Sequence, residues 1–221
     1  NIIDIYEIGH HPRNYFTMEY ITGSTLDKVI GNLKPMDVAK IIYKVVKSVH
    51  FVHKNGIIHR DVKPSNIMLT QEWEPKLMDF GLAKVIDAEV ALSRTGDMLG
   101  TPIYMSPEQI DGKNVDKKSD VYSLGATLYE LLTGKPPFQG DSYMNIVYQI
   151  GSVDPPRPRL LNPAISADLE TICLKCLEKD PSRRYFSCRS LAADLERFIQ
   201  GQPIHARAAG LIYKIGKWVR R

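Results

Sequence analysis

The sequence has little cysteine and no long apolar run, and both shortages exclude classes of protein. Three cysteines among 221 residues are too few for a disulfide framework, and an odd number suits a reducing compartment. No run of 18 apolar residues occurs, so the sequence predicts no membrane-spanning helix within the chain. With 43% hydrophobic and 24% charged residues, the composition is that of a globular chain and excludes a disordered or collagen-like one.

Acidic residues are absent from the last 21 positions. The formal net charge is +4, but residues 201–221 alone carry +5, so residues 1–200 together carry −1. A nearly neutral body gives no reason to expect a nucleic-acid-binding face. The basic tail has two interpretations that the sequence leaves open. It can be a segment just before a membrane span that continues past Arg221, or a solvated linker or terminal helix.

Apolar periodicity predicts a mixed α+β chain that is mainly helical towards its C-terminus. Residues 1–9 and 15–21 are rich in β-branched and aromatic residues and predict a hairpin. Residues 35–54 follow a helical period, with Pro35 near the start and Gly56 just past the end. Short strand-like runs follow at 57–58, 67–69 and 76–78. Further helices are predicted at 118–133, 141–150, 166–178 and 187–200.

Three short loop motifs hold the polar residues best suited to chemistry. The first is HRDVKPSN at residues 59–66, between two strand-like runs. Asp79-Phe80-Gly81 begins 18 residues after Asp61, and Ser106-Pro107-Glu108 begins 27 residues after Asp79. No period holds from 82 to 117, which is long for a compact domain and indicates function or mobility.

In order and spacing these motifs resemble those of the protein kinases, in particular the bacterial-type serine/threonine kinases. The first motif matches the family pattern at every specified position, and SPE stands where APE is usual. The run GTPIYMSPEQ at residues 100–109 is similar to that of bacterial kinases, and Lys63 is the serine/threonine form. The resemblance implies an α+β, protein-kinase-like fold. Residues 1–21 would be small-lobe strands and hinge, 22–200 the large lobe, and 201–221 a basic extension.

The resemblance implies transfer of the γ-phosphoryl group of ATP to Ser or Thr hydroxyls of proteins, with Mg²⁺. Such a reaction needs charge neutralisation and in-line placement more than covalent chemistry. Asp61 would orient the acceptor hydroxyl and take its proton, and Lys63 would place a positive charge beside the transferring group. Asp79 would bridge metal to the phosphates, and Asn66 would supply an oxygen to a second ion.

A second group of residues is implied to bind the adenine. Backbone groups of Glu19 and Ile21 would meet the adenine edge, and Met18 would guard the inner pocket. Met68 would pack beneath the base. The local sequence at residues 18–21 fits an edge strand nearly as well as a hinge. Met68 fits a role as an ordinary core residue equally well.

Other residues are implied to hold the structure of the site: His59, Phe80, Gly81, Glu108, Asp120 and Arg184. Asp120 would hold the backbone of the His59-Arg60 loop, or serve as an acidic residue at a helix N-terminus, or do both. Glu108 would pair with Arg184, which the family spacing D-P-x-x-R at residues 180–184 selects over Arg183.

Regulation and location are also implied by the resemblance. Arg60 would bind a phosphorylated loop residue, and Ser93 and Thr95 resemble autophosphorylation sites or are ordinary polar loop residues. Thr101 would bond towards Asp61 and shape the acceptor pocket. The partners would be protein substrates and a second copy of the chain for autophosphorylation. The location would be the cytoplasm, free or as part of a membrane-anchored protein.

Two patterns are absent or incomplete. No G-x-G-x-x-G and no V-A-I-K-type lysine precede the hinge, so we expect an N-terminally truncated kinase domain with little activity by itself. The alternative is a pseudokinase or scaffold, against which the intact Asp61, Asn66 and Asp79 argue. Cys173-x-x-Cys176 has no second Cys or His pair and predicts buried helix cysteines rather than a metal site.

Overall fold

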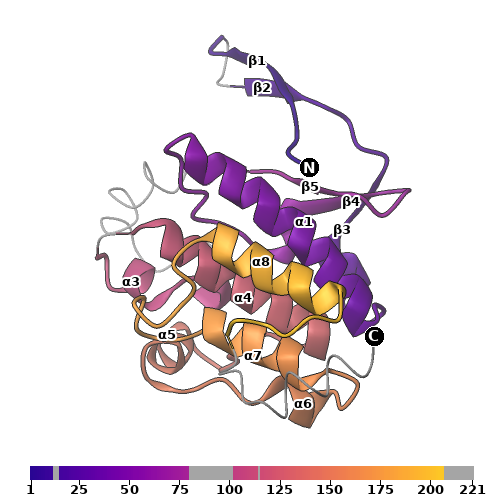
Figure 1. Ribbon diagram of the computed structural model, residues 1–221. Helices are drawn as coiled ribbons and strands as arrows, with labels where there is room; N and C mark the ends of the chain where they lie inside the picture. Colours follow the sequence, from indigo (N-terminus) through magenta and orange to yellow (C-terminus); the bar gives the residue numbers. More distant parts are fainter. Residues whose placement is uncertain (12–14, 80–101, 114, 207–221) are drawn as a thin grey trace.

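Four helices packed side by side form the body of the molecule. The computed structural model describes residues 1–11, 15–79, 102–113 and 115–206. The central helices are α1 (Pro35–Lys54), α4 (Lys117–Thr133), α7 (Ala167–Cys176) and α8 (Cys188–Ile199). Figure 1 shows α8 lying along α1, with α4 and α7 beneath them. The mixed α+β class predicted from the sequence is confirmed.

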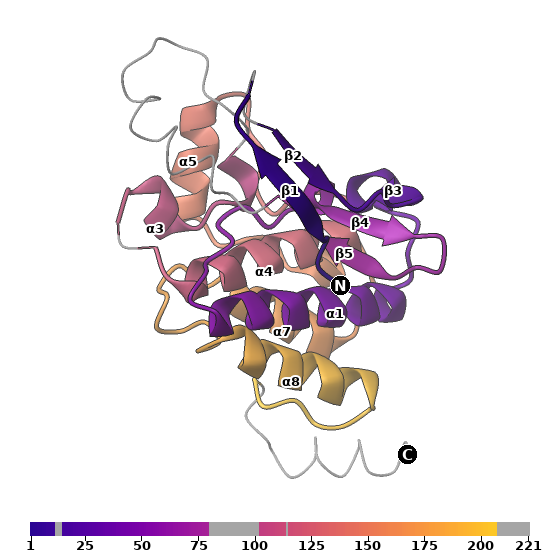
Figure 2. The same cartoon turned by 90° about the horizontal axis from the view of Figure 1, so that it is seen from above.

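The strands form two small antiparallel sheets. A hairpin pairs β1 (Ile5–Gly9) with β2 (Tyr15–Met18), and a second sheet has the order β3 (Gly23–Thr25), β4 (Ile67–Thr70), β5 (Pro75–Leu77). Figure 2 shows this second sheet on one side of α1 and α8 on the other. The sheet therefore places the ends of β4 and β5 beside the helical body.

Short helical segments connect these elements. They are the 3₁₀ turns η1 (Leu26–Val29), η2 (Pro64–Asn66) and η3 (Pro102–Tyr104), and the helices α3 (Pro107–Ile110), α5 (Tyr143–Ser152) and α6 (Pro158–Leu161). The predicted helices agree with α1, α4, α5, α7 and α8 to within two residues at either end. Strand β3 and the helices α3 and α6 were not predicted, and α3 lies in the stretch from 82 to 117 where no period was found.

The strand predicted at 57–58 is wrong. The backbone N–H of Ile57 donates to the Val52 carbonyl, and Gly56 is left-handed with φ 76°. Both features are typical of a helix C-terminus, because they satisfy carbonyls that the helix leaves unpaired. Residues 57–58 therefore close α1 and lead directly into the loop at 59–66.

Helix α4 is the centre of the core and is buried on all sides. Nearly every residue from Ser119 to Leu132 is buried. Its ends are set locally, since Asp116 accepts a hydrogen bond from the backbone N–H of Lys118 and Gly134 ends the helix with φ 77°. A buried helix of this kind fixes any polar side chain on its first turn.

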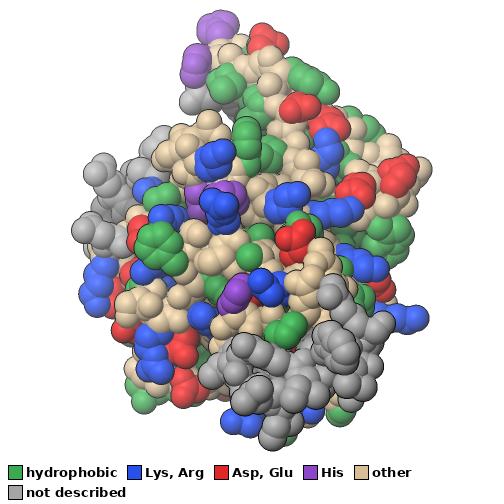
Figure 3. Space-filling view, viewed as in Figure 1, with side chains coloured by type: hydrophobic (Ala, Val, Ile, Leu, Met, Phe, Trp, Pro, Cys, Tyr) green, Lys and Arg blue, Asp and Glu red, His purple; other side chains and the backbone are tan. Residues whose placement is uncertain are grey.

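The N-terminal hairpin contributes little to that core. Hydrophobic side chains along it are exposed, and some are visible on the hairpin at the top of Figure 3. The chain is tied to β5, because Ile3 N donates to Leu77 O (3.0 Å) and Leu77 N donates to Asn1 O (2.8 Å). Strand β5 therefore positions the segment that enters and leaves the hairpin.

The cysteines behave as the sequence predicts. Cys173, Cys176 and Cys188 are unpaired and buried, and burial raises the pKa of each thiol.

Across the described ranges no group of three or more His, Cys, Asp or Glu side chains is arranged to hold a metal ion. Among the helices described, none is long and apolar enough to cross a bilayer.

The close approach of α4 and α7 depends on Gly125. A Cβ atom at this position would lie 2.4 Å from Cys176 Cβ. We expect Gly125→Ala to lower the free energy of unfolding by about 1–3 kcal/mol through overpacking. Gly151→Ala is the matched control, because Gly151 lies in α5 with no atom near the added methyl. It should raise the stability by about 0.5–1 kcal/mol. Urea unfolding of both variants measures the difference, and equal midpoints would contradict the packing argument.

Candidate active site

The loop at 59–66 brings three of the predicted catalytic residues into direct contact. Lys63 Nζ lies 2.9 Å from Asp61 Oδ2, and Asn66 Nδ2 donates to the same oxygen at 2.9 Å. Asn66 Nδ2 also donates to the Asp61 carbonyl at 2.9 Å. Asp61, Lys63 and Asn66 therefore form one hydrogen-bonded cluster.

The local sequence explains how the loop turns back on itself. Lys63 is extended (φ −157°), as the residue before a proline prefers, and Pro64 starts the 3₁₀ turn η2. The turn closes with Asn66 N donating to Lys63 O at 3.0 Å. Asn66 is buried at the end of this turn, directly before β4, and its amide faces the Asp61 carboxylate.

Asp79 joins this cluster through the backbone. It follows β5 directly after Met78, whose N–H donates to Asn66 O at 3.0 Å. The Met78 carbonyl accepts from His59 Nε2 at 3.2 Å. Asp79 itself is left-handed, with φ 54°. The two neighbours Phe80 and Gly81 lie outside the described residues.

His59 links the two loops as a neutral imidazole. Its Nδ1 accepts from the backbone N–H of Asp61 at 3.3 Å, and its Nε2 donates to the Met78 carbonyl. One ring nitrogen must carry the proton and the other must lack it. Burial lowers the pKa of His59, against a smaller opposing effect of the Asp120 charge. The ring therefore suits both of its hydrogen bonds.

Asp120 holds the start of the loop. Its buried carboxylate accepts from the backbone N–H of His59 (2.8 Å), the backbone N–H of Arg60 (2.8 Å) and His53 Nε2 (2.7 Å). The expected contact with the His59-Arg60 backbone is present. Asp120 also lies in the first turn of α4, so the two roles considered for it coexist.

Sequence reasoning missed two residues that hold the same loop. His53, in the last turn of α1, reaches Asp120, and Gln109 Nε2 donates to the Arg60 carbonyl at 3.0 Å. Neither contact has a signature in spacing, because each joins elements that only the fold brings together. The one available signal was the position of Gln109 directly after Glu108 in the third motif.

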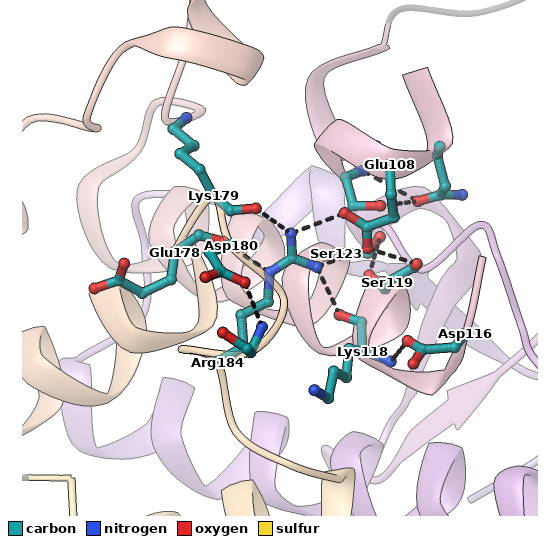
Figure 4. Close-up of polar contacts among 12 residues, drawn as sticks. Glu108, Asp116, Lys118, Ser119, Ser123, Glu178, Lys179, Asp180 and Arg184 are labelled. Carbon is teal, nitrogen blue, oxygen red and sulfur yellow. Dashed lines mark hydrogen bonds and ion pairs between the residues drawn. The ribbon is translucent and has the colours of Figure 1, made fainter. Parts of the chain in front are cut away.

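Glu108 and Arg184 form a buried, bidentate ion pair. Arg184 Nη1 lies 2.7 Å from Glu108 Oε1, and Nη2 lies 2.8 Å from Oε2. Figure 4 shows the guanidinium enclosed by its partners. Its remaining N–H groups donate to the carbonyls of Glu178, Lys118 and Lys179. All five guanidinium donors are therefore satisfied.

The ion pair joins α3 and α4 to the segment before α8. Ser119 Oγ on α4 also donates to Glu108 Oε1, at 2.7 Å. Burial would raise the pKa of Glu108, but the hydrogen bonds from Arg184 and Ser119 and the Arg184 charge lower it to about 2. Helix α3 is thereby fixed to the core.

The predicted hinge residues lie between the hairpin and β5. Met18 ends β2, and Glu19 N donates to Asp4 O at 2.9 Å. The Glu19 carboxylate pairs with Lys76 Nζ (2.9 and 3.1 Å), whose hydrogen bond lowers the pKa of Glu19. Lys76 is the cross-strand neighbour of Met68. Glu19 is thus linked to Met68 through Lys76 on β5, whereas Ser93, Thr95 and Thr101 lie outside the described residues.

Replacement of Arg184 tests the buried ion pair. We expect Arg184→Ala to lower the free energy of unfolding by about 3–5 kcal/mol, because the Glu108 charge is left buried without its partner. Arg183→Ala is the matched control, since the Arg183 side chain is 70% exposed and lies 3.4 Å from Glu178. Its effect should stay below about 1 kcal/mol. Thermal unfolding gives the comparison, and equal melting temperatures would refute the pairing.

The pH dependence of stability tests the same pair from the side of Glu108. The pKa of this carboxyl is depressed from 4.5 to about 2 in the folded chain. Its contribution is therefore complete above pH 4.5 and is lost as the pH falls towards 2. The loss corresponds to about 3 kcal/mol. In urea titrations, the stability gap between the parent and Glu108→Gln should close over this range. A gap that stays constant from pH 6 to pH 3 would contradict the expectation. Asp111→Asn, which removes an exposed pair with Lys113, is the control.

Comparisons with known proteins agree with this geometry. A family model described as protein kinase domain matches residues 1–194. The chain is 42% identical over 214 residues to the serine/threonine-protein kinase PknB of Mycobacterium leprae, covering 93% of this chain and 34% of that protein. It is 41% identical to a probable serine/threonine-protein kinase of Streptomyces coelicolor over 199 residues, covering 88% of this chain and 30% of the relative.

A probable PknB kinase of Bifidobacterium longum is 37% identical, over 91% of this chain and 31% of its own length. The chain thus spans about a third of the length of the curated relatives it matches. The family model covers most of the chain, including the hairpin, the loop at 59–66 and Arg184. The chain belongs to the protein kinase family and is similar to its bacterial serine/threonine members.

Proposed function

We propose that this chain is the catalytic part of a serine/threonine protein kinase, which transfers the γ-phosphoryl group of ATP to protein hydroxyls. The observation that carries the proposal is the Asp61 carboxylate, held by Lys63 and Asn66 at 2.9 Å each. A carboxylate fixed in this way can orient an acceptor hydroxyl and take its proton as the phosphoryl group transfers. The family membership gives this geometry its chemical meaning.

Lys63 has a second role in this proposal. Its ammonium lies beside Asp61 and keeps 30% of the side chain exposed, so it can reach a phosphate that approaches the carboxylate. Phosphoryl transfer develops negative charge on oxygen atoms, and a nearby point charge stabilises that charge. Lys63 would thus hold the transferring group in line with the acceptor hydroxyl.

Asn66 and Asp79 suit a divalent cation such as Mg²⁺. The Asn66 amide nitrogen donates both bonds to Asp61, so the amide oxygen is the atom left as a ligand. Asp79 adds a carboxylate from the segment bonded to Asn66 through Met78. Oxygen donors of this kind match a hard cation. Such an ion, when bound, neutralises the charge of the triphosphate.

The adenine would be bound by the hinge. The Glu19 N–H is occupied by Asp4 O, so Glu19 would offer its carbonyl and Ile21 its backbone groups. Met18 would guard the inner pocket, and Met68 would pack beneath the base. In this assignment residues 1–21 are the last small-lobe strands and hinge, residues 22–200 the large lobe, and 201–221 a basic extension.

Regulation would act through the same loop. Arg60, next to Asp61, would bind a phosphate on Ser93 or Thr95, and Thr101 would shape the acceptor pocket. A second copy of the chain would transfer that phosphoryl group from ATP to the Ser93 or Thr95 hydroxyl, which is autophosphorylation. The domain would work in the cytoplasm, either free or as part of a membrane-anchored protein. A pseudokinase is the alternative, and the intact cluster of Asp61, Lys63 and Asn66 disfavours it.

Replacement of Asp61 tests the proposed reaction. In the full-length protein, Asp61→Asn should lower kcat by about 10²–10⁴-fold, because the proton acceptor is lost. The affinity for ATP should change less than about threefold, since Asp61 does not anchor the nucleotide in this scheme. Phosphate transfer to a Ser/Thr peptide and equilibrium nucleotide binding give the two values.

Asp37→Asn, which changes an exposed carboxylate on α1, is the control and should leave kcat unchanged. If Asp61→Asn retains full turnover, Asp61 is not the acceptor base. If the unaltered protein binds ATP without transferring phosphate to any peptide, the pseudokinase alternative is correct.

A further inference from the structure

We propose that Gln109 is a positioning residue for catalysis, which sets the orientation of the peptide group between Arg60 and Asp61. This inference rests on the proposed kinase function for its effect on turnover. Its structural part, that Gln109 restrains the loop, stands on the hydrogen bonds alone. Gln109 lies on α3, remote in sequence from the loop at 59–66.

The Gln109 side chain uses both ends of its amide. Its Oε1 accepts from the backbone N–H and the hydroxyl of Ser106, each at 3.1 Å, which completes the capping box of α3. Its Nε2 donates to the Arg60 carbonyl at 3.0 Å. A capping box needs only the acceptor end of this side chain. The donor end is therefore available to hold the loop.

The restrained peptide group carries Asp61. Its carbonyl, from Arg60, accepts from Gln109, and its N–H, from Asp61, donates to His59 Nδ1 at 3.3 Å. Both polar atoms of this peptide plane are thus bonded to side chains. Because the plane is attached directly to the Asp61 Cα, its tilt sets the direction in which the carboxylate leaves the backbone.

Arg60 needs such a restraint because its backbone is strained. It is left-handed, with φ 66°, which is unfavourable for a residue with a long side chain. Asp120 holds the N–H of Arg60 and Gln109 holds its carbonyl. Without Gln109, Arg60 keeps the restraint on its N–H but loses the one on its carbonyl. The peptide group between Arg60 and Asp61 can then rotate away from the strained conformation.

Gln109 can act as a fixed point because its own helix is anchored. The preceding residue, Glu108, is bound to Arg184 and to Ser119 in the buried ion pair. The segment before it is held by Ser123 Oγ, which donates to Tyr104 O at 2.8 Å. Movement of α3 would therefore be transmitted to the Asp61 peptide, which couples this segment to the catalytic loop.

The test replaces Gln109 by Glu in the full-length protein. The variant keeps an oxygen that accepts from Ser106. At the other end of the side chain, the donating NH₂ group is replaced by a carboxylate oxygen that faces the Arg60 carbonyl and cannot donate to it. We expect kcat to fall about 10–100-fold, because small misplacements of a reacting group have effects of this size. The affinity for ATP and the KM for the peptide should change less than about threefold.

A pH profile separates orientation from simple destabilisation. Below about pH 5 the new carboxyl begins to protonate and regains a donor, so the ratio of the Gln109→Glu rate to the parent rate should stay constant from pH 7 to about pH 5 and rise below it. Gln109→Met, of similar size and without a donor, should lose turnover with no such recovery. Gln71→Glu, the same chemical change in the exposed β4–β5 turn, is the matched control and should keep the parent rate.

Hydrogen exchange gives a readout that does not need activity. Amides of residues 59–66 should exchange at least about threefold faster in Gln109→Glu and Gln109→Met than in the parent, with Gln71→Glu unchanged. Unchanged exchange and turnover would overturn the inference, as would equal losses of kcat and ATP affinity. Absence of turnover in the parent overturns the proposed function alone, because the exchange result then still decides the restraint.

Discussion

The Asp120 carboxylate is the constraint on which the candidate active site depends. It is completely buried on the first turn of α4, and a buried charge is costly unless hydrogen bonds replace its water. Three donors meet it, from His53 on α1 and from the His59 and Arg60 backbones. The requirement to satisfy one carboxylate therefore brings two helices and the loop at 59–66 together. The start of the loop is therefore fixed by the core, whereas its own sequence closes the turn at 63–66.

A second buried carboxylate, Glu108, holds the other wall of the site by the same means. It is bound by Arg184 and Ser119, so α3 is fixed to α4 at the residue directly before Asp120. Arg60 lies between the two anchors, with its N–H on Asp120 and its carbonyl on Gln109. Each anchor acts on one side of the same strained residue, and Asp61 follows it directly. Stability of the core and orientation of Asp61, the proposed proton acceptor, thus share the same atoms.

The sequence predicted the parts of this arrangement that are local or that belong to the family motifs. The helical period, with Pro35 and Gly56 at the two ends, was sufficient to predict the bounds of α1. The spacing of the motifs was sufficient to select Asp61, Lys63 and Asn66 as candidate site residues. The bonds of His53 and Gln109 were not predicted, because they join residues 67 and 49 positions apart through side chains common in any helix. The two apolar residues at 57–58 misled for a related reason. Their pattern is that of a strand, but among the described residues neither pairs with a strand, and the backbone N–H of Ile57 donates to the Val52 carbonyl.

The distribution of backbone strain favours an enzyme over a scaffold. Within the described residues three non-glycine residues have positive φ: Arg60, Trp73 and Asp79. Trp73 lies in the exposed β4–β5 turn, but Arg60 and Asp79 flank the cluster of Asp61 and Asn66. Each such conformation costs about 1–3 kcal/mol and persists only where the surroundings enforce it. Here the enforcing groups are Asp120 and Gln109 for Arg60, and His59 and Asn66 through Met78 for Asp79. A binding module gains nothing from strain at these two positions, whereas a phosphotransferase needs both oxygen-bearing side chains aimed at one substrate.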